Sequence, residues 1–421
     1  MKKRIAIIGT GISGLTCGYL LNKKHDITVY EANDYIGGHT ATKQVSVNGR
    51  DYDIDTGFIV FNDWTYPHFI SLMDRLGVER QPTEMSFSVT SDSANLEYNG
   101  NNLNTLFAQR RNILRPRFWR IVRDILRFNK ACKALVASKE DTSNKTLYGY
   151  IQELNLSDDF AHYYILPMCA AIWSASLAQT RQFPLTFFLQ FFNNHGLLNV
   201  NDRPQWYTLV GGSHSYIEPI TRAFKDNIRL STPVTSVSRT DDTWSVTSAD
   251  GNAEQFDDVI FACHSDQALK MLASPTQKQK EILGNIPYSM NDVVMHTDTR
   301  ILPKRKLAWA SWNYQIEDIE SEEQAPATVT YDMNILQRID SETTFCVTLN
   351  NTSAIKADCI LGQYRYAHPQ YSENMVAAQQ QRADICGVDG LHFCGAYWYN
   401  GFHEDGVKSA LDVCTRFGES L

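Results

Sequence analysis

The stretch that decides the fold is KRIAIIGTGISGLTCGYLL, residues 3–21, followed by DITVYE, residues 26–31. Residues 3–8 contain a short apolar run of the kind found in a buried parallel strand, and residues 15–21 have a helical pattern. Between them stand Gly9, Gly11 and Gly14. Glycines at this spacing permit a tight turn, close approach of a diphosphate and close packing of the helix on the strand. The stretch therefore predicts a strand–helix–strand unit that binds a dinucleotide.

Two further glycine clusters indicate FAD rather than NAD as the dinucleotide. Glu31 ends the second predicted strand, where an acidic side chain can accept hydrogen bonds from a ribose diol. The first extra cluster is followed by a histidine, and the second lies in YDIDTGF, residues 52–58. The residues assigned to FAD in this part of the chain are Gly9, Gly11, Ile12, Ser13, Gly14, Glu31, Ala32, Gly37, Gly38, His39 and Gly57.

Bulk composition sets limits on the class of protein. The chain has 421 residues, 43% apolar and 20% charged, which is long enough for two lobes. Its nine cysteines form no CxxC pair, which favours reduced thiols in the cytoplasm and no zinc or other metal site. The net charge of −8 gives no reason to expect a nucleic-acid partner. Without 18 uninterrupted apolar residues, no membrane span is expected.

The pattern along the chain predicts an α/β protein with a discontinuous Rossmann-like lobe. Strand and helix patterns alternate to about residue 75, a hairpin is expected at 84–98, and residues 105–198 read mostly as helix. Strands return at 228–261 and 286–365, and the chain ends in a strand, a glycine-rich loop and a helix. We expect an FAD-binding lobe from residues 1–80, 205–268 and 385–421. Residues 81–204 and 269–384 are expected to form an α+β substrate lobe with a helical insertion.

These pieces resemble the flavin-containing amine oxidase superfamily. The matching motifs are GTGISG with Glu31, GGH at 37–39, LVGGS at 209–213, DDVIFAC at 257–263 and FCGAYWYNGFHEDGVKSAL at 393–411. WASWNY at 309–314 and VTYDMN at 329–334 are similar to a bacterial subgroup of predicted FAD/NAD-binding proteins. That subgroup resembles enzymes that desaturate methylated fatty acyl chains in furan fatty acid synthesis.

The resemblance implies an amine-oxidase-like fold, one non-covalent FAD and further cofactor contacts. The additional residues that it assigns to FAD are Val234, Gly395, Phe402, Asp405, Gly406 and Val407, with the last helix starting near Gly406 and its N-terminus toward the flavin. Two departures weigh against amine oxidation. Ala396 stands where relatives often carry an acid, and residues 291–298, comparable to a strand that carries a lysine in amine oxidases, contain none.

Candidate catalytic residues lie in the loop before the last helix. His403 and Glu404 are predicted to handle protons beside the flavin, although loop scaffolding is the alternative. Asp405 is predicted to cap the following helix. The candidate substrate residues are Trp309, Trp312, Asn313 and Tyr331, for which ordinary core packing is equally plausible.

We therefore expect an FAD-dependent oxidoreductase that dehydrogenates a methylated unsaturated acyl chain, or another long apolar substrate, by hydride transfer to flavin N5. An amine oxidase, or an FAD-bound isomerase or binding protein without net redox turnover, remains open. Substrate-dependent loss of flavin colour without oxygen separates the redox reactions from the last of these. The oligomeric state and the electron acceptor are not predicted.

Residues 107–133 stand apart in charge. They hold seven Arg, two Lys and one Asp, a net charge of +8, interspersed with apolar residues such as Ile121 and Leu126. A basic amphipathic helix is typical of elements that lie on an anionic membrane surface. A solvated helix face or a subunit interface is the alternative. The expectation is a cytoplasmic protein in peripheral contact with the inner membrane face.

Overall fold

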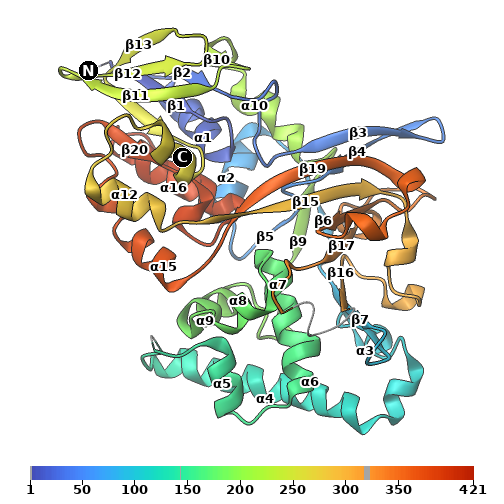
Figure 1. The fold of residues 1–421 in the computed structure, drawn as a ribbon. Coiled ribbons are helices and arrows are strands. Elements are labelled where there is room, and N and C mark those ends of the chain that lie inside the picture. Colours follow the sequence, from blue (N-terminus) through green and yellow to red (C-terminus); the bar gives the residue numbers. More distant parts are fainter. Residues whose placement is uncertain (1, 143, 317–322) are drawn as a thin grey trace.

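The computed structural model describes residues 2–142, 144–316 and 323–421 and has two lobes (Figure 1). The first lobe is built on a five-stranded parallel sheet in the order β10-β2-β1-β14-β20. Its strands are β1 (Arg4–Ile8), β2 (Asp26–Tyr30), β10 (Ile228–Arg229), β14 (Asp258–Phe261) and β20 (Leu391–Phe393). All five lie in the three segments assigned to the FAD-binding lobe.

Two helices cover one face of this sheet and contact each other closely, α1 (Ile12–Leu21) and α16 (His403–Thr415). α1 is buried on almost every side, which explains its apolar sequence without a polar face. A Cβ added at Gly18 would lie 2.6 Å from the ring of Phe224, so glycine is required where α1 meets the loop after α10 (Ile217–Thr221).

Smaller sheets complete this side of the molecule. β11 (Val234–Thr240), β12 (Thr243–Ser248) and β13 (Ala253–Phe256) form an antiparallel sheet, and β3 (Thr42–Val47) pairs with β4 (Arg50–Asp55). β9 (Trp206–Leu209) lies between β5 (Phe61–Asn62) and β6 (Arg80–Thr83). Residues 228–240 open the stretch of strands expected at 228–261, and they are divided between the parallel sheet and the antiparallel one, because Pro233 interrupts the run.

The second lobe contains a seven-stranded mixed sheet in the order β19-β15-β18-β17-β16-β7-β8. The long pair β15 (Tyr288–His296) and β19 (Ile360–Pro369) runs between the two lobes (Figure 1). The remaining strands are β7 (Phe87–Ser91), β8 (Leu96–Asn99), β16 (Trp312–Ile316), β17 (Val329–Asp332) and β18 (Cys346–Leu349). β7 and β8 form the hairpin expected at 84–98.

A layer of helices lies below this sheet in Figure 1, as expected for residues 105–198. Its members are α3 (Leu103–Leu106), α4 (Pro116–Ser138), α5 (Leu147–Glu153), α6 (Asp158–Phe160), α7 (Leu166–Trp173), α8 (Leu177–Arg181) and α9 (Leu185–Asn194). Buried aromatic side chains fill the layer; Phe128, for example, contacts Phe160 and Phe188. Between α6 and α7 the chain forms a π-helical turn, Ala161–Ile165.

The other helices connect these layers. They are α2 (Pro67–Leu76), α11 (Ser265–Met271), α12 (Gln277–Gly284), α14 (Met333–Leu336) and α15 (Glu373–Gln380). α12 and α15 belong to a segment assigned to the substrate lobe, yet they contact each other beside α16 (Figure 1). No helix in the described ranges is both long and apolar enough to cross a membrane.

Candidate active site

A cavity of about 450 Å³ lies at the junction of the two lobes. Its wall includes the start of α1, the loop before α16, and residues of β15, β16, β17 and β19. Of the residues predicted to contact FAD, the cavity is lined by Gly11, Ile12, Ser13, Gly37, His39, Gly57, Gly395 and Phe402. Residues from both ends of the chain and from its middle therefore face one space.

The glycine clusters form a cradle at one end of the cavity. A Cβ built on Gly11 meets no atom within 4 Å, so the space beside this backbone is open. A Cβ on Gly38 would lie 3.2 Å from Cα of Gly11, which shows that the first two clusters adjoin. Gly14 is different, because its Cβ would lie 2.0 Å from the carbonyl oxygen of Gly9. Gly11 thus borders ligand space, while Gly14 serves packing.

The N-terminus of α1 opens into this cradle without a protein cap. Its N-cap residue, Gly11, has no side chain, and the first turn carries no acidic residue. The unpaired N–H groups and positive dipole end there suit a diphosphate. α16 meets α1 at the same place, since the Ser13 hydroxyl donates to the Gly406 carbonyl at 2.9 Å. A Cβ on Gly406 would lie 2.6 Å from the Ile12 side chain, so Gly406 acts by permitting this contact.

Glu31 lies at the end of β2, buried, and outside the cavity lining. One carboxylate oxygen accepts from Thr10 N at 3.0 Å, and the other accepts from Asn33 N at 2.9 Å. The Glu31 carbonyl accepts from Thr232 N at 2.8 Å, which brings the residues before Val234 to this edge of the sheet. Gly9, Ala32 and Val234 also lie outside the lining.

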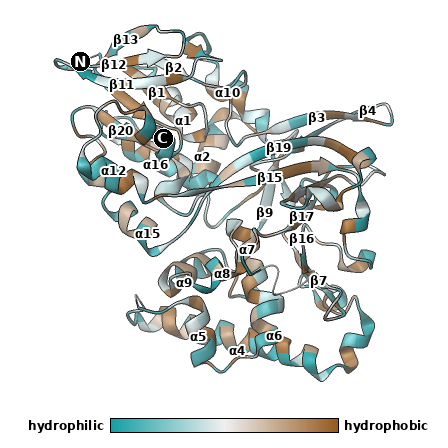
Figure 2. Cartoon of the chain, viewed as in Figure 1, coloured by the Kyte–Doolittle hydropathy of each residue, from teal (hydrophilic) through white to brown (hydrophobic). Residues whose placement is uncertain are grey.

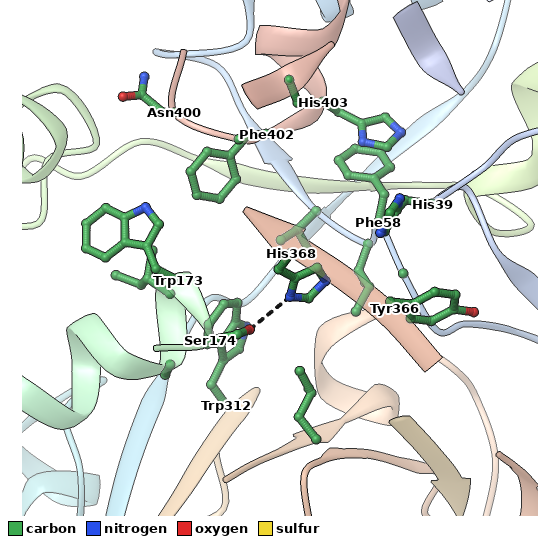
Figure 3. Close-up of a pocket in the computed structure, with 18 of the residues that line it drawn as sticks. His39, Phe58, Trp173, Ser174, Trp312, Tyr366, His368, Asn400, Phe402 and His403 are labelled. Carbon is green, nitrogen blue, oxygen red and sulfur yellow. Dashed lines mark hydrogen bonds between the residues drawn. The ribbon is translucent and has the colours of Figure 1, made fainter. Parts of the chain in front are cut away.

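Several buried polar atoms at the cavity have no hydrogen-bond partner among the described residues. They are His39 Nε2, Trp173 Nε1, Trp312 Nε1 and the Tyr397 hydroxyl. A buried polar group left unpaired costs about 1–3 kcal/mol, so these atoms indicate a bound polar group. His39 follows the second glycine cluster and points into the cavity in Figure 3. The open cradle, the uncapped helix and these atoms fit FAD.

His403 lines the cavity, but its Nε2 atom is already engaged. Its ring stacks on Phe58 with a centroid distance of 3.6 Å (Figure 3). Nε2 lies 3.1 Å from the Thr40 hydroxyl and 3.4 Å from the Tyr216 hydroxyl. Burial, with a smaller contribution from His39, holds the pKa of His403 well below its ordinary value. His403 is therefore neutral.

Glu404 does not line the cavity. Its carboxylate oxygens accept hydrogen bonds from His68 N at 3.1 Å and Phe69 N at 2.8 Å, at the start of α2. The contact joins α16 to α2 and satisfies N–H groups in the first turn of α2. In this position Glu404 anchors a helix, and the proton transfer assigned to it has no geometric support.

The last helix begins at His403, three residues earlier than the expected start near Gly406. Phe402 is its N-cap, and the Asp405 carboxylate accepts from Phe402 N at 2.9 Å. Asp405 thus caps its own helix from the first turn, as the acidic member of a capping box does. Burial raises the pKa of Asp405 to about 7. Asp405, Gly406 and Val407 lie outside the cavity lining.

Two of the four predicted substrate residues, Trp312 and Tyr331, line the cavity. They are cross-strand partners on β16 and β17, with ring centroids 4.9 Å apart. Trp309 and Asn313 do not line it. The Trp309 indole donates to the Pro303 carbonyl at 2.7 Å. The Asn313 amide is occupied by bonds to Ala310, which hold the turn before β16.

The sequence did not single out His368, which lies near the centre of Figure 3. Its Nδ1 is 3.1 Å from the Ser174 hydroxyl and 3.3 Å from the Asn291 amide nitrogen, so Nδ1 is an acceptor and Nε2 carries the proton. Burial and His39 lower the pKa of His368 to about 3. Ser174, at φ 50°, closes α7 beside it. No motif joins these positions, because each comes from a different element.

The cavity is electrostatically simple. The described residues that line it include no Asp, Glu or Lys and one Arg, Arg203. Arg203 is exposed, so it marks a mouth of the cavity, and its charge acts on the half-buried Tyr164 of the π-helical turn. The wall is otherwise mostly apolar and aromatic, with Phe402 stacked on Phe191 at 5.3 Å. No lysine lines the cavity from β15, which contributes Tyr288 and Val293.

A dinucleotide cradle that opens onto a substrate cavity between two such lobes defines an FAD-dependent oxidoreductase. Residues 12–349 match the model of the flavin-containing amine oxidoreductase family. Because this match spans most of the chain, the protein belongs to that family.

Solved structures support the fold. A fatty acid isomerase from P. acnes, whose printed title describes it as producing CLA, is 15% identical with a TM-score of 0.69, over 99% of this chain and 98% of that one. Cyclohexylamine oxidase from Brevibacterium oxydans is 16% identical with a TM-score of 0.68, over 99% and 100%. At such identities the likeness concerns the fold alone.

Two curated relatives match over short segments. The L-glutamate oxidase precursor of Streptomyces diastatochromogenes is 32% identical over 87 residues, and the zeta-carotene desaturase of Capsicum annuum is 34% identical over 80 residues. Each segment covers 19% of this chain and only 13% of the relative. These relatives therefore leave the substrate open.

Proposed function

We propose that the protein dehydrogenates a long apolar chain, with a methylated unsaturated fatty acyl chain as the substrate class. The observation that carries the proposal is the cavity wall, which is mostly apolar and aromatic and has one cation, Arg203, at a mouth. An acyl chain needs apolar walls along its length, and its carboxylate or phosphate end suits a guanidinium. The sequence resemblance to desaturases of methylated acyl chains favours the same substrate.

The same wall is unfavourable for small ammonium substrates. No Asp or Glu of the described residues lines the cavity, and Arg203 would repel a cation. The lining histidines carry no charge that could attract a cation, since burial lowers the pKa of His195 to about 4 and that of His264 to about 3 and leaves both rings neutral. Amine oxidation is thus the outcome that would contradict the proposal.

Bound FAD supplies the acceptor for a hydride that leaves the substrate carbon. An allylic carbon beside a methyl-bearing double bond tolerates this loss best, because the resulting cation is delocalised. A proton must then leave the neighbouring carbon. That proton is strongly acidic in the cation, so a weak neutral base suffices. We assign this role to His403, whose neutral ring lines the cavity. His368 cannot take the proton, because its Nδ1 accepts from Asn291 and its Nε2 carries a hydrogen. It can only donate to a polar group in the cavity.

The experiment is anaerobic reduction of the purified flavoprotein, followed at the flavin absorbance band. A methylated unsaturated fatty acid in detergent should bleach the flavin, while the saturated acid of equal length should not. Bleaching by monoamines or diamines, with none by the lipid, would identify an amine oxidase. An isomerase would convert the lipid, detected by mass spectrometry and double-bond position, without net bleaching.

A further inference from the structure

One face of the substrate lobe is both apolar and basic. It consists of α3, the 3-10 helix Arg110–Leu114, Arg115 and the exposed side of α4 as far as Lys133, and is called here the basic platform. Of the exposed large apolar side chains in the described residues, the two most exposed are Leu114 at 86% and Leu103 at 76%. Ile113, Trp119 and Leu126 add to the same stretch. Apolar and hydrophilic residues alternate along α4 in Figure 2.

Local contacts hold these side chains outward. The Trp119 indole donates to the Ile113 carbonyl at 2.8 Å and packs against Phe107 at 5.3 Å, so α4 and the 3-10 helix form one unit. Trp119 and Leu126 are seven residues apart and share a helix face. The opposite face of α4, with Phe118, Ile121 and Phe128, is buried in the lobe. The exposed apolar residues therefore do not belong to the core.

The positive charges divide into two groups. Arg117 and Arg120 pair with Asp159, and Arg123 and Arg127 pair with Asp124, so these four arginines stabilise the helix layer. In the described part of the chain, the platform cations without a carboxylate partner are Arg110, Arg111, Arg115, Lys130 and Lys133. Desolvation, with smaller contributions from repulsion by Arg115 and Arg305, lowers the pKa of Arg111. The second group is positive charge that no carboxylate neutralises.

We propose that the basic platform docks on an anionic lipid surface. Its charge is complementary to such a surface, and its exposed leucines and tryptophan suit the headgroup boundary. The chain carries −8 overall while residues 107–133 carry +8. An anionic surface therefore repels the rest of the protein and attracts the platform, which orients the platform toward the lipid. Two cavity-lining residues, Gly100 and Asn101, immediately precede the platform. This places the cavity wall next to the lipid.

A second copy of the chain is a less favourable occupant of this face. Two platforms facing each other would bring together five unneutralised cations from each side. A lipid surface avoids that repulsion and covers the same apolar side chains. The use of the contact to deliver an acyl chain rests on the proposed function, whereas lipid binding itself does not.

The test is co-sedimentation of the FAD-loaded protein with vesicles of phosphatidylcholine that contain or lack 30 mol% phosphatidylglycerol. The wild type should bind the anionic vesicles and be released by salt, because exposed charges are screened over about 8 Å at physiological ionic strength. Leu103→Ser/Leu114→Ser should weaken binding about tenfold or more. Arg111→Glu/Lys130→Glu should do the same and flatten the salt dependence, since each cation contributes about 1 kcal/mol near such a surface.

Matched controls lie on the other lobe. Lys270→Glu/Lys280→Glu makes the same change in net charge at exposed positions, and Val388→Ser removes an exposed apolar side chain. Both should bind as the wild type does. Equal binding by the platform variants, or equal binding of the wild type to both vesicle types, would overturn the proposal. A wild-type dimer in light scattering that Leu103→Ser/Leu114→Ser converts to a monomer would assign the face to self-association.

Turnover of a detergent-solubilised substrate separates this inference from the proposed function. Platform variants that lose vesicle binding should keep the wild-type rate in detergent and the wild-type ratio of flavin to protein absorbance. An enzyme that binds vesicles but oxidises only amines would leave the docking inference intact and contradict the proposed substrate.

Discussion

The two ends of the cavity are specified in different ways. At the FAD end, backbone constraints determine which residue each position needs, as at Gly11 and Gly14, which are three positions apart. At the substrate end, side chains determine the shape and polarity of the wall. His368, Ser174 and Arg203 come from a strand, a helix end and a loop. A backbone requirement leaves a mark in local sequence, whereas a wall assembled from distant elements does not. Cofactor and substrate are therefore predictable to different degrees.

The glycine pair offers the largest effects and the sharpest test of the backbone end. Gly14→Ala forces a Cβ against the Gly9 carbonyl oxygen, so we expect a loss of about 3 kcal/mol in the free energy of unfolding and no bound FAD. Gly11→Ala meets open space, so the protein should fold but purify colourless or weakly yellow. Denaturant unfolding and the flavin-to-protein absorbance ratio measure both. Stoichiometric FAD in Gly11→Ala would contradict the placement of the diphosphate.

At the substrate end, His403→Gln should slow anaerobic flavin reduction by about 10²–10⁴-fold, because positioned proton transfer contributes this much. His368→Gln removes a hydrogen-bond donor from the cavity wall and should cause a smaller loss, with FAD content unchanged in both. Stopped-flow absorbance gives the rates. A wild-type rate in His403→Gln would remove this residue from the mechanism.

The charged mouth is tested by Arg203→Gln. Loss of the guanidinium should raise KM for a free fatty acid about fivefold while the maximal rate of flavin reduction stays the same, since an exposed charge contact contributes about 1 kcal/mol to binding. The methyl ester of the same acid is the control, because it lacks the carboxylate and should be insensitive to the change. An equal effect on acid and ester would mean that Arg203 acts through the shape of the mouth and not through attraction of the carboxylate.

The smallest expected effect concerns pH. Burial lowers the pKa of His195 to about 4, below the value of about 6.5 in an unfolded chain. As pH falls through 6.5, the unfolded state takes up a proton that the folded state does not, so this residue lowers the free energy of unfolding. Between pH 7 and 5.5 the advantage of wild type over His195→Gln should shrink by about 1 kcal/mol. Urea unfolding at the two pH values measures it. A pH-independent difference would show that His195 is solvated.

The sequence predicted the parallel sheet, the helical layer and the glycine cradle, because periodicity and glycine spacing are local properties. It misplaced the start of α16, since Asp405 reaches back to Phe402 N and the helix includes His403 and Glu404. It also assigned Trp309 and Asn313 to the cavity, although both make bonds that hold loops. Adjacent positions on a strand point to opposite faces, so Trp312 lines the cavity while Asn313 does not. The cavity histidine His368 could not be recognised, because its partners, Asn291 and Ser174, are 77 and 194 residues away.

The π-helical turn Ala161–Ile165 amounts to one extra residue in the helix that lines the mouth. Deleting one residue there would restore a regular α-helix and rotate the preceding segment by about 100° relative to α7. Tyr164 faces the cavity from this turn, whereas its neighbour Tyr163 gives its carbonyl to the Tyr98 hydroxyl. Deletion of a single residue can therefore change the shape of this end of the cavity, without any substitution among the other residues of its wall.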